Sequence, residues 1–277
     1  MGTTRKKNAA LSKLATTIVL VAIACATIWC ESQLEQRPDE PGPTEPVPSP
    51  PFDPGPPHGN ETITSFSTAK RELGEIHNEG QHEITFYCGC RYMDKSVDLR
   101  SCGYRVRRNP TRAKRIEYEH VVPAARYGHA FSEWTEGHAD CKDSHGEPFK
   151  GRDCARRASP TFALMEADMY NLQPAIGEVN GDRLNYEVGE IEGEAREYGA
   201  CDVEIADQRV EPAPAIRGDV ARTYRYMAWA YPQHMTLTPR EIALFEQWDR
   251  ADPVDEWERD RAKRIEAVQG NHNPFVR

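Results

Sequence analysis

The chain has 277 residues, of which 38% are hydrophobic and 29% charged, and its formal net charge is −9. This length fits one globular domain with tails. A mean hydropathy of −0.74, together with the lack of a long apolar run after residue 30, excludes a polytopic membrane protein. Aromatic residues make up 9% of the chain, which argues against disorder through its body.

The N-terminus has the pattern of an export signal. Basic residues precede Leu14–Ala24, an apolar stretch of h-region length that ends in small residues. We therefore expect residues 1–24 to be a signal peptide, and an uncleaved single-span anchor is the alternative. Ile23-Ala24-Cys25 resembles the end of a bacterial lipobox, so a lipid anchor at Cys25 and free release into the periplasm or medium both stay open.

A proline-rich segment follows the signal. Ten of the 21 prolines lie between Arg37 and His58, a composition that favours extended polyproline II structure and a stiff spacer. A plain disordered leader is the alternative. We predict a linker over residues 25–62 and one folded domain over residues 63–277.

Six cysteines lie in the body of the chain, an even number in an exported protein. They are Cys88, Cys90, Cys102, Cys141, Cys154 and Cys201. Such a set predicts disulfides, with fifteen connectivities open. Zinc binding through Cys88 and Cys90 is the alternative, but their spacing is tighter than the usual gap and no CxxC pair follows.

Charge is unevenly distributed along the body. Residues 88–157 contain 15 Lys or Arg against 10 Asp or Glu, whereas residues 158–277 contain 13 against 23. The basic residues are densest between Arg105 and Arg115. Clustered arginine is typical of a surface that binds a phosphate backbone, although a solvated face of mixed charge is the commoner meaning of such a run.

A strand pattern comes directly after this basic run. The alternating apolar residues of Ile116–Val122 predict a strand that carries Glu119 and His120 at its end. Adjacent side chains of a strand point to opposite faces unless the backbone bends, and Pro123 makes a bend plausible. A carboxylate that holds a hard cation, beside an imidazole that takes a proton, suits hydrolysis.

A second cluster surrounds Asn171. Ser159-Pro160 is a helix start, and the apolar spacing predicts a helix that runs past Asn171 until Pro174 stops it. Asn171 is a candidate neutral oxygen ligand, or else it caps that helix. Residues 177–183 are predicted to form a turn-rich loop.

The C-terminal region predicts supporting helices. One covers residues 221–229. A capping box at Thr238–Glu241 opens a second, which runs to about Asp249. A third runs from Asp252-Pro253 to Gly270.

Several long motifs occur in a fixed order along the body. They are RIEYEHVVPAARYGH, KGRDC, MEADMYNLQPAIGEVNGDR, ARTYRYM and VQGNHNPFV. In this order they resemble the bacterial endonuclease I family of periplasmic and secreted nucleases, from about Tyr87 to Phe275. The resemblance implies a ββα-metal (His-Me finger) motif within a mixed α+β domain. It also implies a bound Mg²⁺, which Mn²⁺ could replace, and cleavage of DNA, often also RNA, to 5′-phosphate ends.

The resemblance also implies roles for individual residues. His120 would be the general base, Glu119 and Asn171 would bind the metal, and Arg152 would contact the phosphate beside the scissile bond. The partners would be double- and single-stranded DNA, with weak sequence preference because nothing supplies base readout. We expect a monomer with no obligate protein partner. The alternative is an inactive nucleic-acid-binding or toxin-like module on the same fold.

Overall fold

The computed structural model describes residues 52–193 and 195–277. The predicted signal peptide, Cys25 and the linker up to residue 51 therefore lie outside the described residues. Residues from Pro54 to Arg277 form one unit. Within the described ranges, no helix is both long and apolar enough to cross a bilayer.

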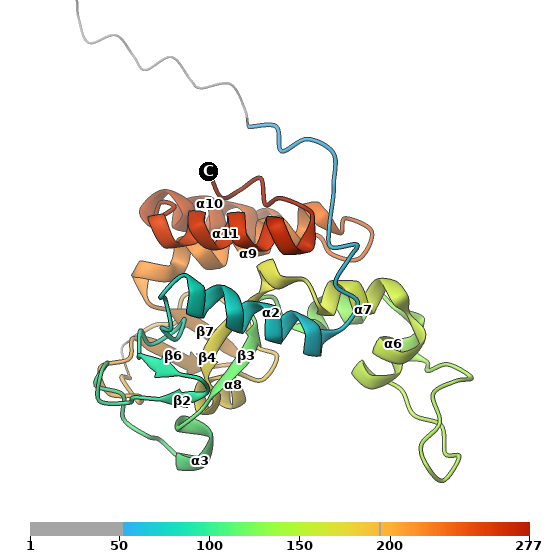
Figure 1. The fold of residues 1–277 in the computed structure, drawn as a ribbon, viewed down its shortest axis with the longest axis horizontal. Coiled ribbons are helices and arrows are strands. Elements are labelled where there is room, and N and C mark those ends of the chain that lie inside the picture. Colours follow the sequence, from blue (N-terminus) through green and yellow to red (C-terminus); the bar gives the residue numbers. More distant parts are fainter. Residues whose placement is uncertain (1–51, 194) are drawn as a thin grey trace, which may run out of the picture. The chain divides into compact units, whose positions relative to one another are not determined.

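The longer helices lie together on one side of this unit (Figure 1). They are α2 (Phe66–Glu79), α9 (Arg217–Ala230), α10 (Pro239–Ala251) and α11 (Glu256–Gln269). Helix α9 packs on α10, and α11 packs on α2. Large side chains with under 2% exposure, among them Leu73, Tyr224 and Trp248, fill the core between them. The predicted capping box of α10 is confirmed, and Gly270 ends α11 with a φ of 90°, as the sequence predicts.

The strands form small separate sheets, so the mixed α+β class is confirmed. Strand β3 (Ile116–His120) pairs antiparallel with β4 (Leu172–Ile176), and His120 lies opposite Leu172. A short helix, α8 (Gly177–Arg183), follows β4 directly. Strands β1 (Tyr92–Met93) and β2 (Ser96–Val97) form a hairpin. The third sheet has the order β5-β7-β6, from Glu187–Val188, Arg209–Pro212 and Val203–Ala206.

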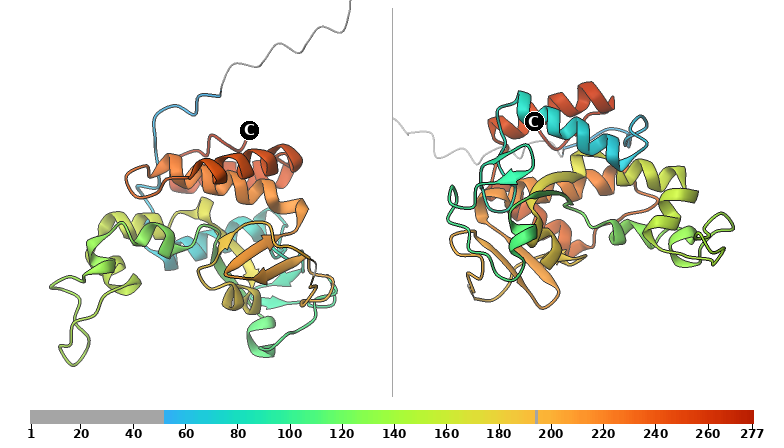
Figure 2. Two further views of the ribbon diagram at one scale, coloured as in Figure 1. Left: turned by 180° about the vertical axis from the view of Figure 1, so that it is seen from behind. Right: turned by 60° about the horizontal axis from the view of Figure 1, so that its bottom comes forward.

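Short helices fill the long connection between β3 and β4. In chain order they are α4 (Ala124–Gly128), α5 (Ser132–Thr135), α6 (Arg152–Ala158), α7 (Pro160–Glu166) and the 3₁₀ turn η1 (Met169–Asn171). Two further short elements lie outside this connection, α3 (Pro110–Ala113) and η2 (Pro214–Ile216). Between α5 and α6 the chain projects as a long hairpin, residues 136–151, which both views in Figure 2 show clear of the helices.

The six body cysteines form three disulfides. Cys88 pairs with Cys201 and Cys90 with Cys102, each with Cα atoms 4.7 Å apart. Cys141 pairs with Cys154 at a Cα separation of 5.3 Å and ties the projecting hairpin to α6. The disulfide prediction is confirmed, and the zinc alternative is wrong because each of these thiols is used in a covalent bond.

Two local predictions need correction. The helix that opens at Ser159 ends at Glu166 rather than near Pro174. Asp168 accepts a hydrogen bond from Tyr170 N and caps a separate 3₁₀ turn, after which residues 172–176 are a fully buried strand. A short apolar run buried on all sides satisfies helix and strand patterns equally. Residues 177–183, predicted as a loop, form helix α8 instead, because this segment packs against β3 and β4.

Candidate catalytic groove

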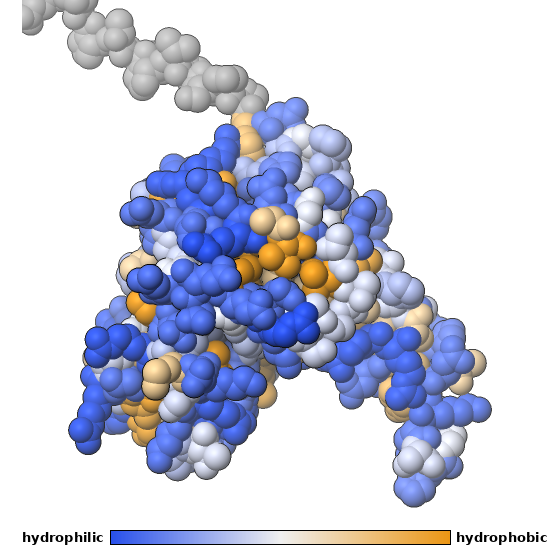
Figure 3. All heavy atoms as spheres, in the orientation of Figure 1, coloured by the Kyte–Doolittle hydropathy of each residue, from blue (hydrophilic) through white to orange (hydrophobic). Residues whose placement is uncertain are grey.

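A groove with a volume of about 1260 Å³ brings most of the sequence-predicted site residues together. Its walls come from α2, the β1–β2 turn, β3 and the end of α8. Glu119, His120 and Arg152 all line it. Figure 3 shows this face hollowed between the lobe that carries β1, β2 and α3 and the projecting hairpin. Both Glu119 and His120 reach the groove because His120 is the last residue of β3, where the strand ends before Pro123.

His120 is held in one orientation at the end of β3. Its Nε2 lies 2.9 Å from the carbonyl oxygen of Glu166. Since a carbonyl can only accept, Nε2 carries the proton and Nδ1 keeps its lone pair. Burial, and after it the charge of Arg152, lower the pKa of His120 to about 4. The imidazole is therefore neutral at pH 7, with Nδ1 able to accept a proton.

Arg152 is fixed beside that nitrogen by a buried carboxylate. Its Nη2 lies 3.4 Å from His120 Nδ1, and its Nε donates to Glu166 Oε1 at 2.5 Å. Glu166 is fully buried and also accepts from Arg156. Burial acts to raise the pKa of Glu166, but hydrogen bonds and charge from Arg156 and Arg152 outweigh it and hold that pKa below its usual value. The result is a rigid cationic group next to the neutral imidazole.

Glu119 is held by a buried arginine from α8. Arg183 donates to Glu119 Oε1 and to the carbonyl oxygens of His120 and Val121, the latter two at 2.6 Å. Tyr87 adds a longer contact to the same carboxylate oxygen, at 3.4 Å. No hydrogen bond to the other oxygen, Oε2, is found among the described residues. Glu119 thus has one carboxylate oxygen anchored by an ion pair with Arg183.

The structure does not bring Asn171 into the groove. Asn171 is fully buried. Its Oδ1 accepts from Val122 N at 2.7 Å, and its Nδ2 donates to Val122 O at 3.0 Å. The side chain therefore clamps the chain just beyond His120. Both ends of its amide are used in that clamp, so its oxygen does not face the other site residues.

Asn180, on α8, does line the groove. Its Nδ2 donates to Glu117 Oε2 at 3.1 Å. Since the two ends of an amide point in different directions, this bond turns Oδ1 away from Glu117. Of the two asparagines in the motif MEADMYNLQPAIGEVNGDR, Asn180 is therefore the one that lines the same groove as Glu119 and His120.

The predicted phosphate-binding cluster needs correction, because most of its arginines are paired within the protein. Arg107 pairs with Asp182 and Glu197, and Arg112 and Arg115 both pair with Glu117. Arg105 donates to the carbonyl oxygens of residues 196 and 197. The ion pairs offset the charges of Arg107, Arg112 and Arg115. The cations that line the groove come from elsewhere in the chain and are Lys70, Arg71, Lys95 and Arg152.

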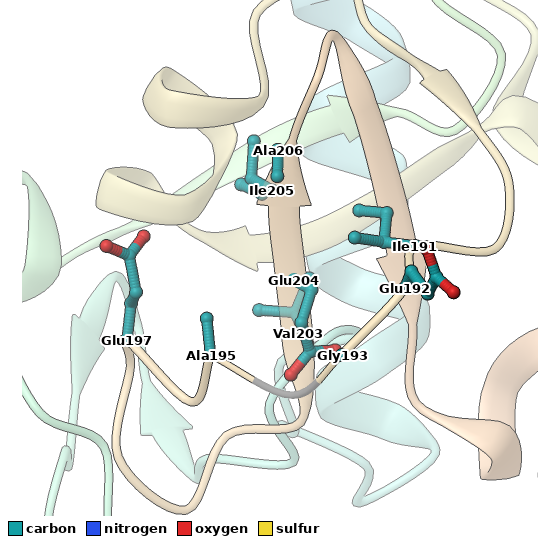
Figure 4. Close-up of a pocket in the computed structure, with 9 residues that line it drawn as sticks. All are labelled: Ile191, Glu192, Gly193, Ala195, Glu197, Val203, Glu204, Ile205 and Ala206. Carbon is teal, nitrogen blue, oxygen red and sulfur yellow. The ribbon is translucent and has the colours of Figure 1, made fainter.

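A second cavity, of about 300 Å³, lies beside β6 (Figure 4). Its lining combines apolar side chains such as Val203 and Ile205 with three glutamates, Glu192, Glu197 and Glu204. None of the predicted site residues lines it. The carboxylates make it unsuited to an anionic substrate.

Sequence reasoning missed Glu166, Asn180 and Arg183. All three residues lie within the motif MEADMYNLQPAIGEVNGDR, one of those that carry the family resemblance. Residues 177–183 contain two glycines, a composition that predicts a loop rather than the helix that aims Asn180 and Arg183 at the end of β3. Glu166 acts on His120 and Arg152 only through tertiary contacts.

Comparison with known proteins identifies the class. The Endonuclease I family model matches residues 60–277. A periplasmic deoxyribonuclease of Aeromonas hydrophila is 42% identical over 220 residues, which cover 76% of this chain and 85% of the relative. Endonuclease-1 of Buchnera aphidicola subsp. Acyrthosiphon pisum is 40% identical over 222 residues, 78% of this chain and 82% of the relative. An extracellular ribonuclease of Bacillus subtilis is 30% identical over 126 residues, 39% of this chain and 43% of the relative.

The protein is therefore an enzyme of the endonuclease class. It belongs to the Endonuclease I family. Its similarity to periplasmic and extracellular relatives, together with three disulfides, places its function outside the cytoplasm.

Proposed function

We propose that this protein is an exported, Mg²⁺-dependent endonuclease that hydrolyses DNA to 5′-phosphate ends with little sequence preference, through a His-Me finger site. The observation that carries the proposal is the single groove that contains His120, Glu119, Arg152 and Asn180. The order β3, β4, α8 supports a ββα-metal motif, since two antiparallel strands and a following helix surround these residues. The deoxyribonuclease relatives support DNA as the substrate.

The donor set fits Mg²⁺. Mg²⁺ prefers oxygen ligands and usually takes only one or two from the protein, with water and phosphate oxygens completing its octahedron. Among the described residues no group of three or more His, Cys, Asp or Glu is arranged to hold a metal, so a cage made only of protein ligands is not the arrangement here. Glu119 Oε2 and Asn180 Oδ1 would be the protein ligands. Asn180 replaces Asn171 in this role because the oxygen of Asn171 accepts from Val122 N.

Each residue then has a defined task. Bound Mg²⁺, or Mn²⁺ in its place, would stabilise negative charge on the phosphate and on the leaving 3′-oxygen. His120 Nδ1 accepts a proton from the attacking water while Glu166 O holds Nε2–H. Arg152 donates to a phosphate oxygen, for which a guanidinium is well matched. Arg183 holds Glu119 in place.

The direct test is nicking of supercoiled plasmid by the mature protein, with Mg²⁺, with Mn²⁺, and with EDTA. We expect nicking with either metal and none with EDTA, and 5′-phosphate on the product ends. Single-stranded DNA and RNA are parallel substrates, and the ribonuclease relative is the reason to include RNA. DNA binding without cleavage under every metal condition would favour the inactive-module alternative.

The two asparagines give a sharper test. Asn180→Ala should raise the Mg²⁺ concentration needed for half-maximal rate by about tenfold or more and leave stability nearly unchanged. Asn171→Ala should destabilise the fold by about 1–3 kcal/mol, because buried backbone groups of Val122 lose their partners, and should leave the Mg²⁺ titration in place. The opposite pattern would return the ligand role to Asn171.

Two further points, the oligomeric state and the N-terminal anchor, concern the protein outside the groove. We propose that it is a monomer that needs no protein partner. Whether a lipid joins it to a membrane at Cys25 is decided by mass spectrometry of the mature N-terminus, in which an acylated Cys25 and an unmodified new terminus differ in mass.

A further inference from the structure

The groove contains apolar surface that phosphate binding does not need. Among the described residues, Met93 and Leu184 are the most exposed large hydrophobic side chains, at 72% and 64%. Both line the catalytic groove. Single exposed apolar residues are common on protein surfaces. Here, however, the two most exposed ones share the wall of a groove proposed to receive a charged backbone.

The backbone at Leu184 is strained. Leu184 closes α8 with φ 55° and ψ −123°, a region that glycine adopts freely and that costs other residues about 1–3 kcal/mol. The other non-glycine residues with positive φ in the described chain are Gln81, Asp94, Arg196, Asp207 and Gln208. All of those are polar. Leu184 is the apolar member of this set, and it is also the one beside the residues that hold Glu119.

The strained position is rigidly tied to the catalytic residues. The preceding residue, Arg183, is 1% exposed and donates to Glu119 and to the carbonyl oxygens of His120 and Val121. The peptide that carries Leu184 therefore cannot shift without breaking the support of the site. Asn180, four residues earlier, lines the same groove. Leu184 thus lies in the groove wall directly after a residue that is anchored to Glu119.

We propose that Leu184, assisted by Met93 at the β1–β2 turn, is a positioning residue that inserts against the base stack of duplex DNA and opens the step beside the scissile phosphate. This inference rests on the proposed function. Apolar wedges of leucine or methionine partly unstack base steps and kink the duplex. Such opening costs least at pyrimidine–purine steps, which are the most deformable. The enzyme then prefers duplex sites at TA and CA steps without reading any base directly.

The test compares duplex and single-stranded cleavage by the full mature enzyme. Leu184→Gly removes the wedge and relieves the backbone, and Leu184→Ala removes the wedge while the backbone stays strained. For both variants we expect kcat/KM on duplex DNA to fall about tenfold, and kcat/KM on single strands of the same sequence to stay within about twofold, because a single strand needs little unstacking. The excess of cuts at TA and CA steps should flatten as well. Met93→Ala should change the duplex to single-strand ratio in the same direction.

Two control variants separate this effect from general changes. Gln208→Gly relieves a positive φ of 59° in the β6–β7 turn, outside the groove. Ile242→Ala removes a 45% exposed apolar side chain on α10. Both should leave the duplex to single-strand ratio and the cut-site profile unchanged. Thermal melting of each variant checks that the fold is intact, and the single-strand rate checks the catalytic groups.

The outcomes are distinct. Unchanged duplex cleavage and step bias in Leu184→Gly would overturn the wedge and leave the proposed nuclease intact. An equal loss on duplex and single strand would also overturn it, because Leu184 would then support the catalytic groups rather than deform DNA. A wild-type enzyme that cuts neither form of DNA would instead refute the proposed function on which the wedge depends.

Discussion

A single hydrogen bond, from His120 to the carbonyl oxygen of Glu166, determines the tautomer of the His120 imidazole. The carbonyl of Glu166 selects which nitrogen carries the proton, and the neighbouring Arg152 disfavours a second proton. A histidine at the end of a strand has no such preference by itself. The tautomer and charge of this imidazole are therefore set by residues 32 and 46 positions away in the chain.

His120→Ala should reduce cleavage by roughly 10²- to 10⁴-fold, because proton abstraction from water loses its acceptor. Affinity for DNA, measured by fluorescence anisotropy with Mg²⁺ present, should change little, since the groove cations remain. His129→Ala, an exposed histidine outside the groove, is the matched control and should cleave at the wild-type rate. A His120→Ala enzyme with wild-type turnover would remove His120 from the mechanism.

His77 on α2 should make the fold sensitive to acid. It is 1% exposed, and its Nδ1 lies 2.9 Å from the carbonyl of His82. Burial lowers the pKa of His77 to about 3, and the charge of Arg261 acts in the same direction. A folded pKa below the unfolded one means that the unfolded chain binds more protons, so stability is lost as pH falls from about 6.5 toward 3.

Between pH 7 and pH 5 this residue alone should remove about 2 kcal/mol from the free energy of unfolding. His77→Asn keeps a donor near the Nδ1 position and cannot titrate in this range. Urea denaturation at the two pH values should therefore show a smaller pH effect in the variant, by about that amount. Parallel pH profiles for both proteins would contradict the assignment.

At the scale of elements, the sequence predicts an element correctly where residues within one turn of it determine its start or end. The capping box of Thr238 with Glu241 starts α10 as expected, because the bonds that stabilise a helix start lie within one turn. The segment after Ser159 behaves differently. Its apolar spacing continues past Glu166, yet the chain leaves the helix because Leu172–Ile176 pairs with β3. A partner strand 52 or more residues away has no local signature.

The disulfides should contribute unequally to stability. Cys88–Cys201 closes a loop with a sequence separation of 113, and Cys90–Cys102 one of 12. Loop-closure entropy predicts losses of about 5 and about 3 kcal/mol when each pair is replaced by serine. Chemical denaturation of the two double variants measures the difference. An equal loss, or a larger loss from the short loop, would show that chain entropy does not dominate here.

The oxidation state itself is checked on the mature wild-type protein. Mass spectrometry after thiol alkylation should find no label on the six body cysteines, and expression in a reducing compartment should yield less active enzyme. Label on Cys141 or Cys154 in the exported protein would contradict the bond that ties the projecting hairpin to α6.

At the scale of the whole molecule, the charge opposes the substrate. The chain carries a net charge of −9, and Arg107, Arg112 and Arg115 of the basic run form ion pairs within the protein. The cations that line the groove offer local attraction to a phosphate backbone. Salt weakens that attraction, but it also screens the repulsion from the acidic remainder of the protein.

Activity should therefore rise with NaCl from the lowest ionic strength, reach a maximum, and then fall. Initial rates at fixed Mg²⁺ measure the profile. Lys70→Ala should lower the rate at the maximum, because Lys70 lines the groove. The maximum itself should remain, because the acidic surface is unchanged. A steady fall from the lowest salt would show that the groove cations alone set the response.

The sequence by itself determined the family, the α+β class and the disulfide-forming set, and it proposed Glu119, His120 and Arg152 as site residues, because long motifs and local patterns encode these directly. Only the tertiary structure decided which cysteines pair, which arginines are neutralised, and which asparagine faces the groove. The physical reason is that each of these depends on a partner distant in sequence. The sequence proposed Asn171 as a ligand, but Val122 engages its amide, whereas helix α8 presents Asn180 to the groove.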